Sequence, residues 1–115
     1  MDLVVAPAKP LRRFDIYLVN LEPTVGSEMR KVRPCLVVSP DEMHGFVRTV
    51  IVAPMTSAVH GYPMRPPIRF QRKTGEIALD QIRAIDRGRL LRRLGAADRA
   101  TAAIVADKLV EMFTL

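Results

Sequence analysis

The stretch Arg33-Pro34-Cys35-Leu36-Val37-Val38 sets a cation and a proline directly before four consecutive apolar residues. A similar run, Val50-Ile51-Val52-Ala53, follows it and ends at Pro54. Short β-branched runs bounded by prolines are typical of strands that are buried on both faces or that cross the interior of a barrel. We therefore expect both runs to be buried strands, with Arg33 at the entrance to the first.

Shorter strand patterns surround these two runs. Phe14 to Leu21 fits a strand that ends at Glu22-Pro23, and residues 22–32 then form a polar, charged loop around Gly26. Further strands are expected at 68–71, 77–79 and 81–85, with a turn at Lys73-Thr74-Gly75. Many short strands with frequent turns in a short chain predict a small β-barrel.

Helices are expected mainly at the end of the chain. Asp98 is placed to cap a C-terminal helix. Its apolar stripe consists of Ala102, Val105, Leu109 and Met112, with Ala106 and Phe113 beside them. A single helical turn is expected at 41–45 and a second short helix at 89–94, ended by Gly95. The predicted fold class is therefore mainly β with a C-terminal helix.

At 115 residues the chain suits one domain, which we place at residues 14–115 behind a loose arm of residues 1–13. Eighteen Lys and Arg residues against twelve Asp and Glu residues give a net charge of +6, and fourteen of the cations are Arg. The guanidinium group binds phosphate through a planar, two-pronged contact, so a polyanionic partner fits this composition. GC-rich genomes also inflate Arg content, and composition leaves both explanations open.

Cys35 is the only cysteine and lies in an apolar run. We interpret it as a small buried hydrophobe and exclude a disulfide and a cysteine-based zinc site. No apolar run reaches the roughly 18 residues needed to span a bilayer, and residues 1–11 lack the pattern of a secretion signal. We therefore expect a cytoplasmic protein without a membrane segment.

The sequence holds none of the short motifs of metalloproteases, zinc sites, phosphate-binding loops or hydrolase elbows. Its two histidines, His44 and His60, are expected to be exposed loop residues rather than an acid and base pair. Arg33 has two interpretations. It holds a phosphate, or it anchors the following loop by pairing with Glu28 or Asp80.

Polar side chains also stand at the ends of other expected strands. Thr56 and Ser57 follow the run 50–53, where hydroxyl groups either serve a reaction or cap the local backbone. Asp80, Gln81 and Arg83 either belong to a site or form a surface ladder of polar side chains. Pattern alone does not decide between these alternatives.

Six short motifs follow one another along the chain. They are Asp15-Ile16, Gly26-Ser27-Glu28, Arg33-Pro34, Pro54-Met55-Thr56-Ser57, Tyr62-Pro63 and Asp80-Gln81-Ile82-Arg83-Ala84-Ile85-Asp86. In this order and at these separations they resemble the MazF/PemK toxins of type II toxin–antitoxin systems. The resemblance extends from about Phe14 to the C-terminus.

The resemblance implies an SH3-like β-barrel that forms a homodimer, cleaves single-stranded RNA at specific sequences and needs no metal or cofactor. In that family the ribose 2′-hydroxyl attacks the neighbouring phosphate and leaves a 2′,3′-cyclic phosphate and a 5′-hydroxyl. The same resemblance assigns catalysis to Arg33 and Thr56 and implies an acidic antitoxin as a partner. It gives RNA-binding or site-supporting roles to Glu28, Ser57, Asp80, Gln81 and Arg83.

This chain departs from the family pattern near its Asp-Gln motif. In some members the Asp of that motif joins catalysis together with an Arg two residues before it, but here that position is Ala78. The departure favours Arg33 and Thr56 over Asp80 as the catalytic residues. The chain also lacks Trp and has few aromatic residues near the expected loops, so base selection is expected to depend on hydrogen bonds and Arg planes.

Two other functions stay open. A gyrase-poisoning toxin of the CcdB kind shares the fold, but this chain ends in Glu111-Met112-Phe113-Thr114-Leu115 instead of the Trp-Gly-Ile ending on which that activity depends. A barrel that binds nucleic acid without cutting it is the third candidate. Arg33→Ala and Thr56→Ala separate it from an enzyme, because only an enzyme has a cleavage activity for them to abolish.

Overall fold

The computed structural model describes residues 10–115. Most of the expected N-terminal arm therefore lies outside the described residues. In chain order the elements are β1 (Asp15–Asn20), β2 (Val32–Val37), α1 (Asp41–His44), β3 (Thr49–Thr56), β4 (Pro67–Phe70), β5 (Lys73–Ile77), the 3-10 turn η1 (Leu79–Gln81), β6 (Arg83–Asp86), the 3-10 turn η2 (Arg87–Arg89), β7 (Leu90–Ala96) and α2 (Arg99–Met112). The fold is mainly β with a C-terminal helix, as the sequence predicts.

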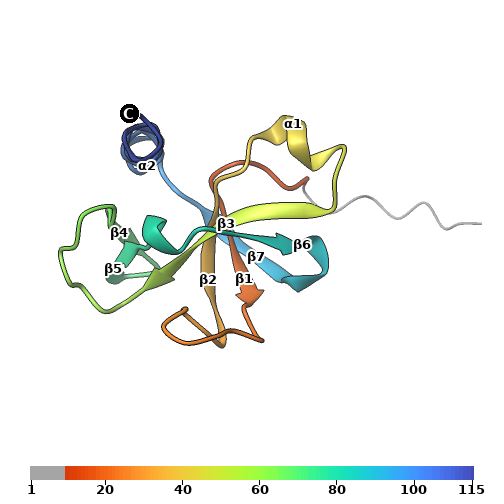
Figure 1. Cartoon of the computed structure of the whole chain (residues 1–115), viewed down its shortest axis with the longest axis horizontal. Coiled ribbons are helices and arrows are strands. Elements are labelled where there is room, and N and C mark those ends of the chain that lie inside the picture. Colours follow the sequence, from red (N-terminus) through yellow and green to blue (C-terminus); the bar gives the residue numbers. More distant parts are fainter. Residues whose placement is uncertain (1–9) are drawn as a thin grey trace, which may run out of the picture.

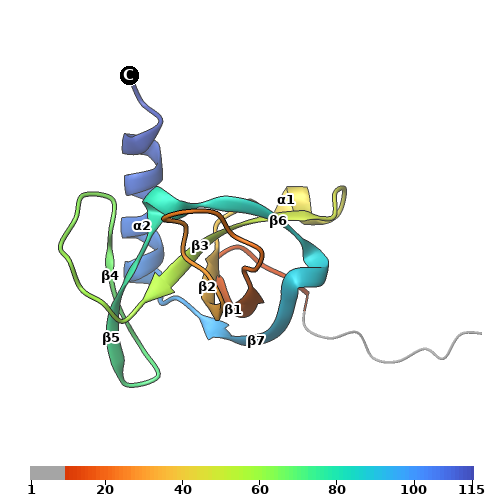
Figure 2. The same ribbon diagram turned by 60° about the horizontal axis from the view of Figure 1, so that its bottom comes forward.

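The strands form one antiparallel sheet in the order β4-β5-β3-β2-β1-β7. β6 pairs with the first half of β3, and β5 pairs with its last two residues, so β3 is shared by both parts of the sheet. Figures 1 and 2 show the sheet curling around its own axis, with α2 standing beside β4 and β5. This curled sheet is the small barrel expected from the many short strands.

The two central strands are buried on both faces, as their apolar runs predict. Leu36 of β2 belongs to one apolar cluster, which also contains Val105 of α2. Its neighbours Cys35 and Val37 point to the opposite face and join a second cluster with Val50 and others. Because alternate residues of a strand face opposite sides, β2 serves two cores at once.

The strand boundaries differ from the prediction at the prolines. β3 passes through Pro54, which the sequence suggested as its end. The carbonyl of Pro54 accepts a hydrogen bond from the Ala78 N–H at 2.8 Å, on the side where the partner of β3 changes from β6 to β5. The missing N–H of Pro54 therefore falls at a break in the ladder and costs no strand pairing.

The hairpin of β4 and β5 turns earlier than expected. Gln71 and Arg72 form the turn with φ angles of 51° and 64°, and both positive angles are those of a two-residue type I′ turn. Lys73 and Gly75, predicted to be in the turn, lie within β5. The expected strand at 77–79 ends at Ile77, and Gln81 lies in η1 instead of a strand.

The short helix predicted at 89–94 is wrong. This segment forms most of β7, which pairs with β1 along its length. Leu90 packs against the second apolar cluster, and Leu94 packs against the first. Hydrogen bonding to an otherwise unpaired edge of β1 therefore outweighs the local helical spacing of the leucines.

α2 begins as predicted and differs at its end. The Asp98 Oδ1 accepts a hydrogen bond from the Thr101 N–H at 2.8 Å and caps the helix. Val105 is fully buried, and Leu109 and Met112 pack against the core. Phe113, expected beside this stripe, is 73% exposed. The apolar face of α2 is therefore narrower than predicted.

The described part of the N-terminal arm contacts the domain near α1. The Arg13 N–H donates to Asp41 Oδ1 at 2.6 Å, and the Arg12 side chain pairs with the same carboxylate at 3.3 Å. Leu11 packs against the second apolar cluster. Residues 11–13 are thus docked on the domain, in contrast to the loose arm expected there.

Candidate active site

Strand register brings Arg33 and Thr56 together. Cys35 of β2 pairs with Pro54 of β3. Arg33 lies two residues before Cys35 and Thr56 lies two residues after Pro54, so both side chains leave the same face of the sheet at matching positions. Both residues line one cleft of about 400 Å³. The other residues lining it are Pro34, Met55, Ser57, Ile68, Phe70, Gln71, Lys73, Thr74 and Gly75.

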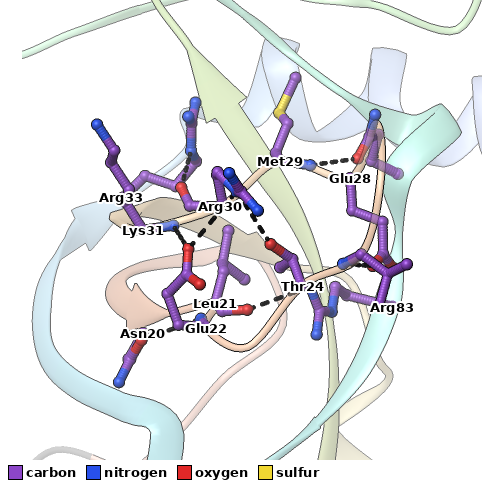
Figure 3. Close-up of polar contacts among 12 residues, drawn as sticks. Asn20, Leu21, Glu22, Thr24, Glu28, Met29, Arg30, Lys31, Arg33 and Arg83 are labelled. Carbon is purple, nitrogen blue, oxygen red and sulfur yellow. Dashed lines mark hydrogen bonds and ion pairs between the residues drawn. The ribbon is translucent and has the colours of Figure 1, made fainter.

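Arg33 is positioned by backbone carbonyl groups. Its Nε donates to the Arg30 carbonyl at 3.2 Å (Figure 3). Its Nη1 donates to the Met55 carbonyl at 3.4 Å. Within residues 10–115 no carboxylate lies within ion-pair distance of this guanidinium. The alternative in which Arg33 pairs with Glu28 or Asp80 is therefore wrong. Its charge is held in place and is not neutralised.

Thr56 is held by the chain that follows it. Its Oγ1 accepts a hydrogen bond from the Ala58 N–H at 3.1 Å, so the backbone-capping interpretation is confirmed. A hydroxyl has one hydrogen and two lone pairs, so this bond leaves the hydrogen of Thr56 free for a further partner. Ser57 lines the same cleft and is exposed.

Gly75 allows β5 to approach Thr56 closely. A Cβ added at Gly75 would lie 2.3 Å from the carbonyl oxygen of Thr56, a contact that no side chain tolerates. Any other residue would push β5 away from the end of β3. The glycine therefore fixes the position of Thr56 against the wall of the cleft.

The charge of the cleft is positive. Of the residues lining it, Arg33 and Lys73 carry charge, and neither a carboxylate nor an imidazole is among them. Such a lining attracts an anionic ligand, because no negative side chain in the cleft repels it.

Gln81 and Arg83 hold the loop between β1 and β2 and do not line the cleft. The Gln81 Oε1 accepts from the Met29 N–H at 2.9 Å, and its Nε2 donates to the Ser27 carbonyl at 3.4 Å. Arg83 Nη1 donates to the Leu21 carbonyl at 3.4 Å. Figure 3 shows Met29 at one end of these contacts and Arg83 beside Leu21 at the other. Gln81 and Arg83 therefore do not form the surface ladder of polar side chains that was one alternative, and they do not line the cleft. Their hydrogen bonds instead shape the loop that carries Arg30.

Glu28 acts within the same loop. Its Oε1 accepts from the Val25 N–H at 2.6 Å, and its own N–H donates to the Val25 carbonyl at 3.2 Å. The side chain closes a small turn around Gly26. Glu28 is exposed and does not line the cleft.

Asp80 forms an ion pair with Arg65, a residue that the sequence analysis did not single out. Arg65 donates to both of its carboxylate oxygens, at 2.6 Å from Nε and 3.0 Å from Nη2. These hydrogen bonds lower the pKa of Asp80 below its ordinary value. The guanidinium that binds Asp80 comes from the segment between β3 and β4, and Asp80 lies outside the cleft.

Glu76 is the second site residue that sequence reasoning missed. It lies opposite Thr56 in the pairing of β3 with β5, and it is 2% exposed. Its Oε2 accepts from the Gly61 N–H at 2.7 Å, and this hydrogen bond lowers its pKa. Its Oε1 lies 3.6 Å from Arg65 Nη1. No local motif marks such a pair, because the two residues meet only through the fold.

The two histidines lie apart, and only one is exposed. His44 lies in α1, with Nε2 2.8 Å from Ser39 Oγ and Nδ1 3.3 Å from the Leu11 carbonyl. It is half-buried and structural. His60 is exposed in the loop after β3, as expected, and its ring stacks on Tyr62.

Residues 10–115 contain no group of three or more His, Cys, Asp or Glu side chains placed to hold a metal ion. None of the helices described there has the length and apolar character required to cross a bilayer. Cys35 is fully buried, and burial raises the pKa of its thiol to about 12.

Comparison with known protein families matches residues 12–113 to the PemK-like, MazF-like toxins of type II toxin–antitoxin systems. The chain belongs to this family. A protein named Endoribonuclease MazF from Staphylococcus epidermidis is 33% identical over 90 residues, which cover 73% of this chain and 75% of that protein. The resemblance carried by the six motifs is thereby confirmed, and this PemK/MazF-like toxin is separated from the gyrase poisons of the CcdB kind.

Solved structures agree with this family. The crystal structure of MazF from Deinococcus radiodurans has a TM-score of 0.82 and 26% identity, covering 94% of this chain and all of that one (100%). A MazE-MazF crystal structure from the same organism has a TM-score of 0.70 and 26% identity, covering 89% of this chain and 94% of that one. The curled sheet and C-terminal helix of this chain are therefore those of a MazF toxin.

Proposed function

We propose that this toxin is an endoribonuclease that cuts single-stranded RNA in the cleft between Arg33 and Thr56. The observation that carries the proposal is the guanidinium of Arg33, which has no ion-pair partner within residues 10–115 and shares with the Thr56 hydroxyl a cleft lined by no carboxylate. Its relatives are named endoribonucleases, which supports the same activity here. The RNA phosphate is the anion that fits this lining.

The reaction we propose uses a nucleophile that the RNA itself supplies. The ribose 2′-oxygen attacks the adjacent phosphorus, the bond from phosphorus to the 5′-oxygen breaks, and a 2′,3′-cyclic phosphate and a 5′-hydroxyl remain. The protein then has to align the two groups and stabilise the additional negative charge on phosphorus. No step in this sequence requires a metal ion or a cofactor.

Arg33 stabilises the charge on the phosphate. A guanidinium has five N–H donors, and two hydrogen bonds to carbonyl groups fix its position. The remaining donors are available for the non-bridging phosphate oxygens. Because the group is held before the RNA arrives, it loses little freedom when charge develops in the transition state.

Thr56 orients the reacting phosphate. Its hydroxyl hydrogen can donate to the phosphate while its oxygen stays fixed by the Ala58 N–H. A threonine hydroxyl is a weak proton acceptor and a guanidinium offers only N–H donors, so neither side chain suits the role of general base. We therefore assign the proton transfers to water, which takes the proton of the 2′-hydroxyl and returns one to the 5′-oxygen.

The antitoxin we propose is an acidic, partly disordered chain that covers this positive cleft. The net charge of +6 and the cations Arg33 and Lys73 that line the cleft suit such a partner. Neighbours solved as MazE-MazF complexes support this assignment.

We also propose that the protein is a homodimer. The apolar side chains of Val110 and Phe113 are exposed at the end of α2, which is typical of a protein contact surface. We place the protein in the cytoplasm, where mRNA is available.

Cleavage of a long single-stranded transcript by the purified protein tests the proposal. With EDTA present we expect cuts whose fragments carry 2′,3′-cyclic phosphate and 5′-hydroxyl ends. A deoxyribose at the cut position should abolish cleavage there, because the nucleophile is missing. Arg33→Ala should remove activity while a matched control on β4, Arg69→Ala, retains it, since Arg69 is exposed and outside the cleft. Binding without cleavage by the wild-type protein would support the non-catalytic barrel instead.

A further inference from the structure

Two aromatic rings are stacked in the loop that follows Thr56. The ring centroids of His60 and Tyr62 are 4.8 Å apart and their planes differ by 8°. His60 is exposed and Tyr62 is 55% exposed. The pair therefore presents a flat aromatic surface to solvent.

Buried charges hold this ring pair in place. Gly61, between the two rings, has a φ of +68°, a conformation that favours glycine, and its N–H donates to the buried carboxylate of Glu76 at 2.7 Å. The Arg65 guanidinium lies over the Tyr62 ring at 5.3 Å from its centroid. The side chain of Arg65 is 6% exposed and is fixed by both oxygens of Asp80.

This construction is unusual for a solvent-exposed loop. Burial of Arg65 and Glu76 is costly unless their charges are paired, and Arg65 forms ion pairs with both Glu76 and Asp80. Its effect is to cover Tyr62 with a guanidinium and to leave the ring of His60 open. The open face of the His60 ring can therefore stack with one more flat group.

The ring pair stands beside the proposed reaction centre. The loop begins at Ser57, which lines the cleft, and Glu76 is the cross-strand partner of Thr56. Arg33, Thr56 and Glu76 thus occupy matching positions on β2, β3 and β5. Glu76 also accepts the hydrogen bond from Gly61, which lies between the two rings. The loop that carries His60 is therefore a neighbour of any strand whose phosphate is bound at Arg33 and Thr56.

We propose that His60 and Tyr62 form a stacking subsite for an unpaired RNA base that flanks the cut phosphate. The proposal rests on the endoribonuclease function above and names a part of its substrate site. Single-stranded RNA is bound largely by stacking of bases on aromatic rings, and every base has a face that can stack. This subsite would add aromatic stacking to the hydrogen bonds and Arg planes expected from the sequence.

The test uses an oligonucleotide built around a site that the wild-type protein cuts in a long transcript. The probe carries deoxyribose at the cut position, so that it binds without reacting, and 2-aminopurine at each flanking position in turn. The variants are His60→Ala, which removes the exposed ring, and His60→Phe, which restores a ring without the imidazole. Phe46→Ala is the matched control, because Phe46 is 89% exposed and does not line the cleft.

We expect 2-aminopurine fluorescence to be quenched at one flanking position by the wild-type protein and by His60→Phe, and not by His60→Ala. Loss of one base–ring stack should weaken probe binding about 5- to 150-fold in His60→Ala. KM should rise, with kcat little changed, and Phe46→Ala should match the wild type. Equal quenching and affinity in His60→Ala and the wild type would overturn the subsite alone. Failure of the wild type to cut any transcript would overturn the proposed function itself.

Discussion

Arg33 and Thr56 face each other across β2 and β3, at the positions next but one to the paired residues Cys35 and Pro54. The register of two buried strands therefore brings together a cation and a hydroxyl that are 23 residues apart in the sequence. The relationship depends on the core and not on the loops. It explains how a small protein can hold two side chains from separate strands in one fixed arrangement.

Arg33→Lys should reduce RNA cleavage by about 10²–10³-fold, the effect of losing one fixed donor to a developing oxyanion. A lysine keeps the charge but has no planar fork to bind two phosphate oxygens and the carbonyls of Arg30 and Met55 together. Single-turnover cleavage rates measure this loss. The melting temperature should stay near that of the wild type, and near-normal cleavage by Arg33→Lys would mean that charge alone suffices.

Gly75→Ala should damage both stability and cleavage. Its methyl group would meet the Thr56 carbonyl, so β5 has to move, at a cost of about 1–3 kcal/mol for an overpacked site. Chemical denaturation and cleavage assays measure the two effects. Gly45→Ala is the control, because a Cβ there has no heavy atom within 4 Å. Equal behaviour of the two variants would contradict the close approach of β5 to Thr56.

Gln81→Leu should loosen the loop between β1 and β2 without unfolding the protein. The substitution removes the hydrogen bonds to Met29 and Ser27, each worth about 0.5–1.5 kcal/mol. Hydrogen exchange should accelerate at residues 27–29 and stay unchanged in α2, which serves as the internal control. Unchanged exchange in the loop would show that Gln81 does not hold it.

Acid should destabilise the network around Arg65. Hydrogen bonds from Arg65 and Gly61 lower the folded-state pKa values of Asp80 and Glu76 below their ordinary values of 3.8 and 4.5. Their contribution to stability is therefore complete above those ordinary values and is lost as the pH falls through the lower folded-state values. Urea denaturation between pH 6 and about pH 3 should show this decline, and Asp80→Asn should flatten it. A parallel decline in Asp80→Asn would assign the acid sensitivity to other groups.

The central strands were predictable because their apolar runs reflect burial on both faces. Leu36 and Cys35 belong to opposite cores, and such a strand has an unbroken apolar sequence. The segment at 89–94 was not predictable in this way. Its leucine spacing fits a helix, and only the free edge of β1 makes it a strand.

The candidate site was predicted in part. Arg33 and Thr56 stand at strand ends and are carried by the family motifs, so both were named from sequence, and the fold places them in one cleft. Arg65 and Glu76 carry no motif. Their importance arises from contacts between separate elements, which sequence patterns at one position do not encode.

A double-mutant cycle tests most directly whether Arg33 and Thr56 act on one phosphate. Single-turnover cleavage rates would be measured for the wild type, Arg33→Lys, Thr56→Val and the double variant. If both side chains serve one transition state, the double variant should be little slower than the slower single variant. Losses that simply multiply would show that the two residues act independently and would contradict a shared reaction centre.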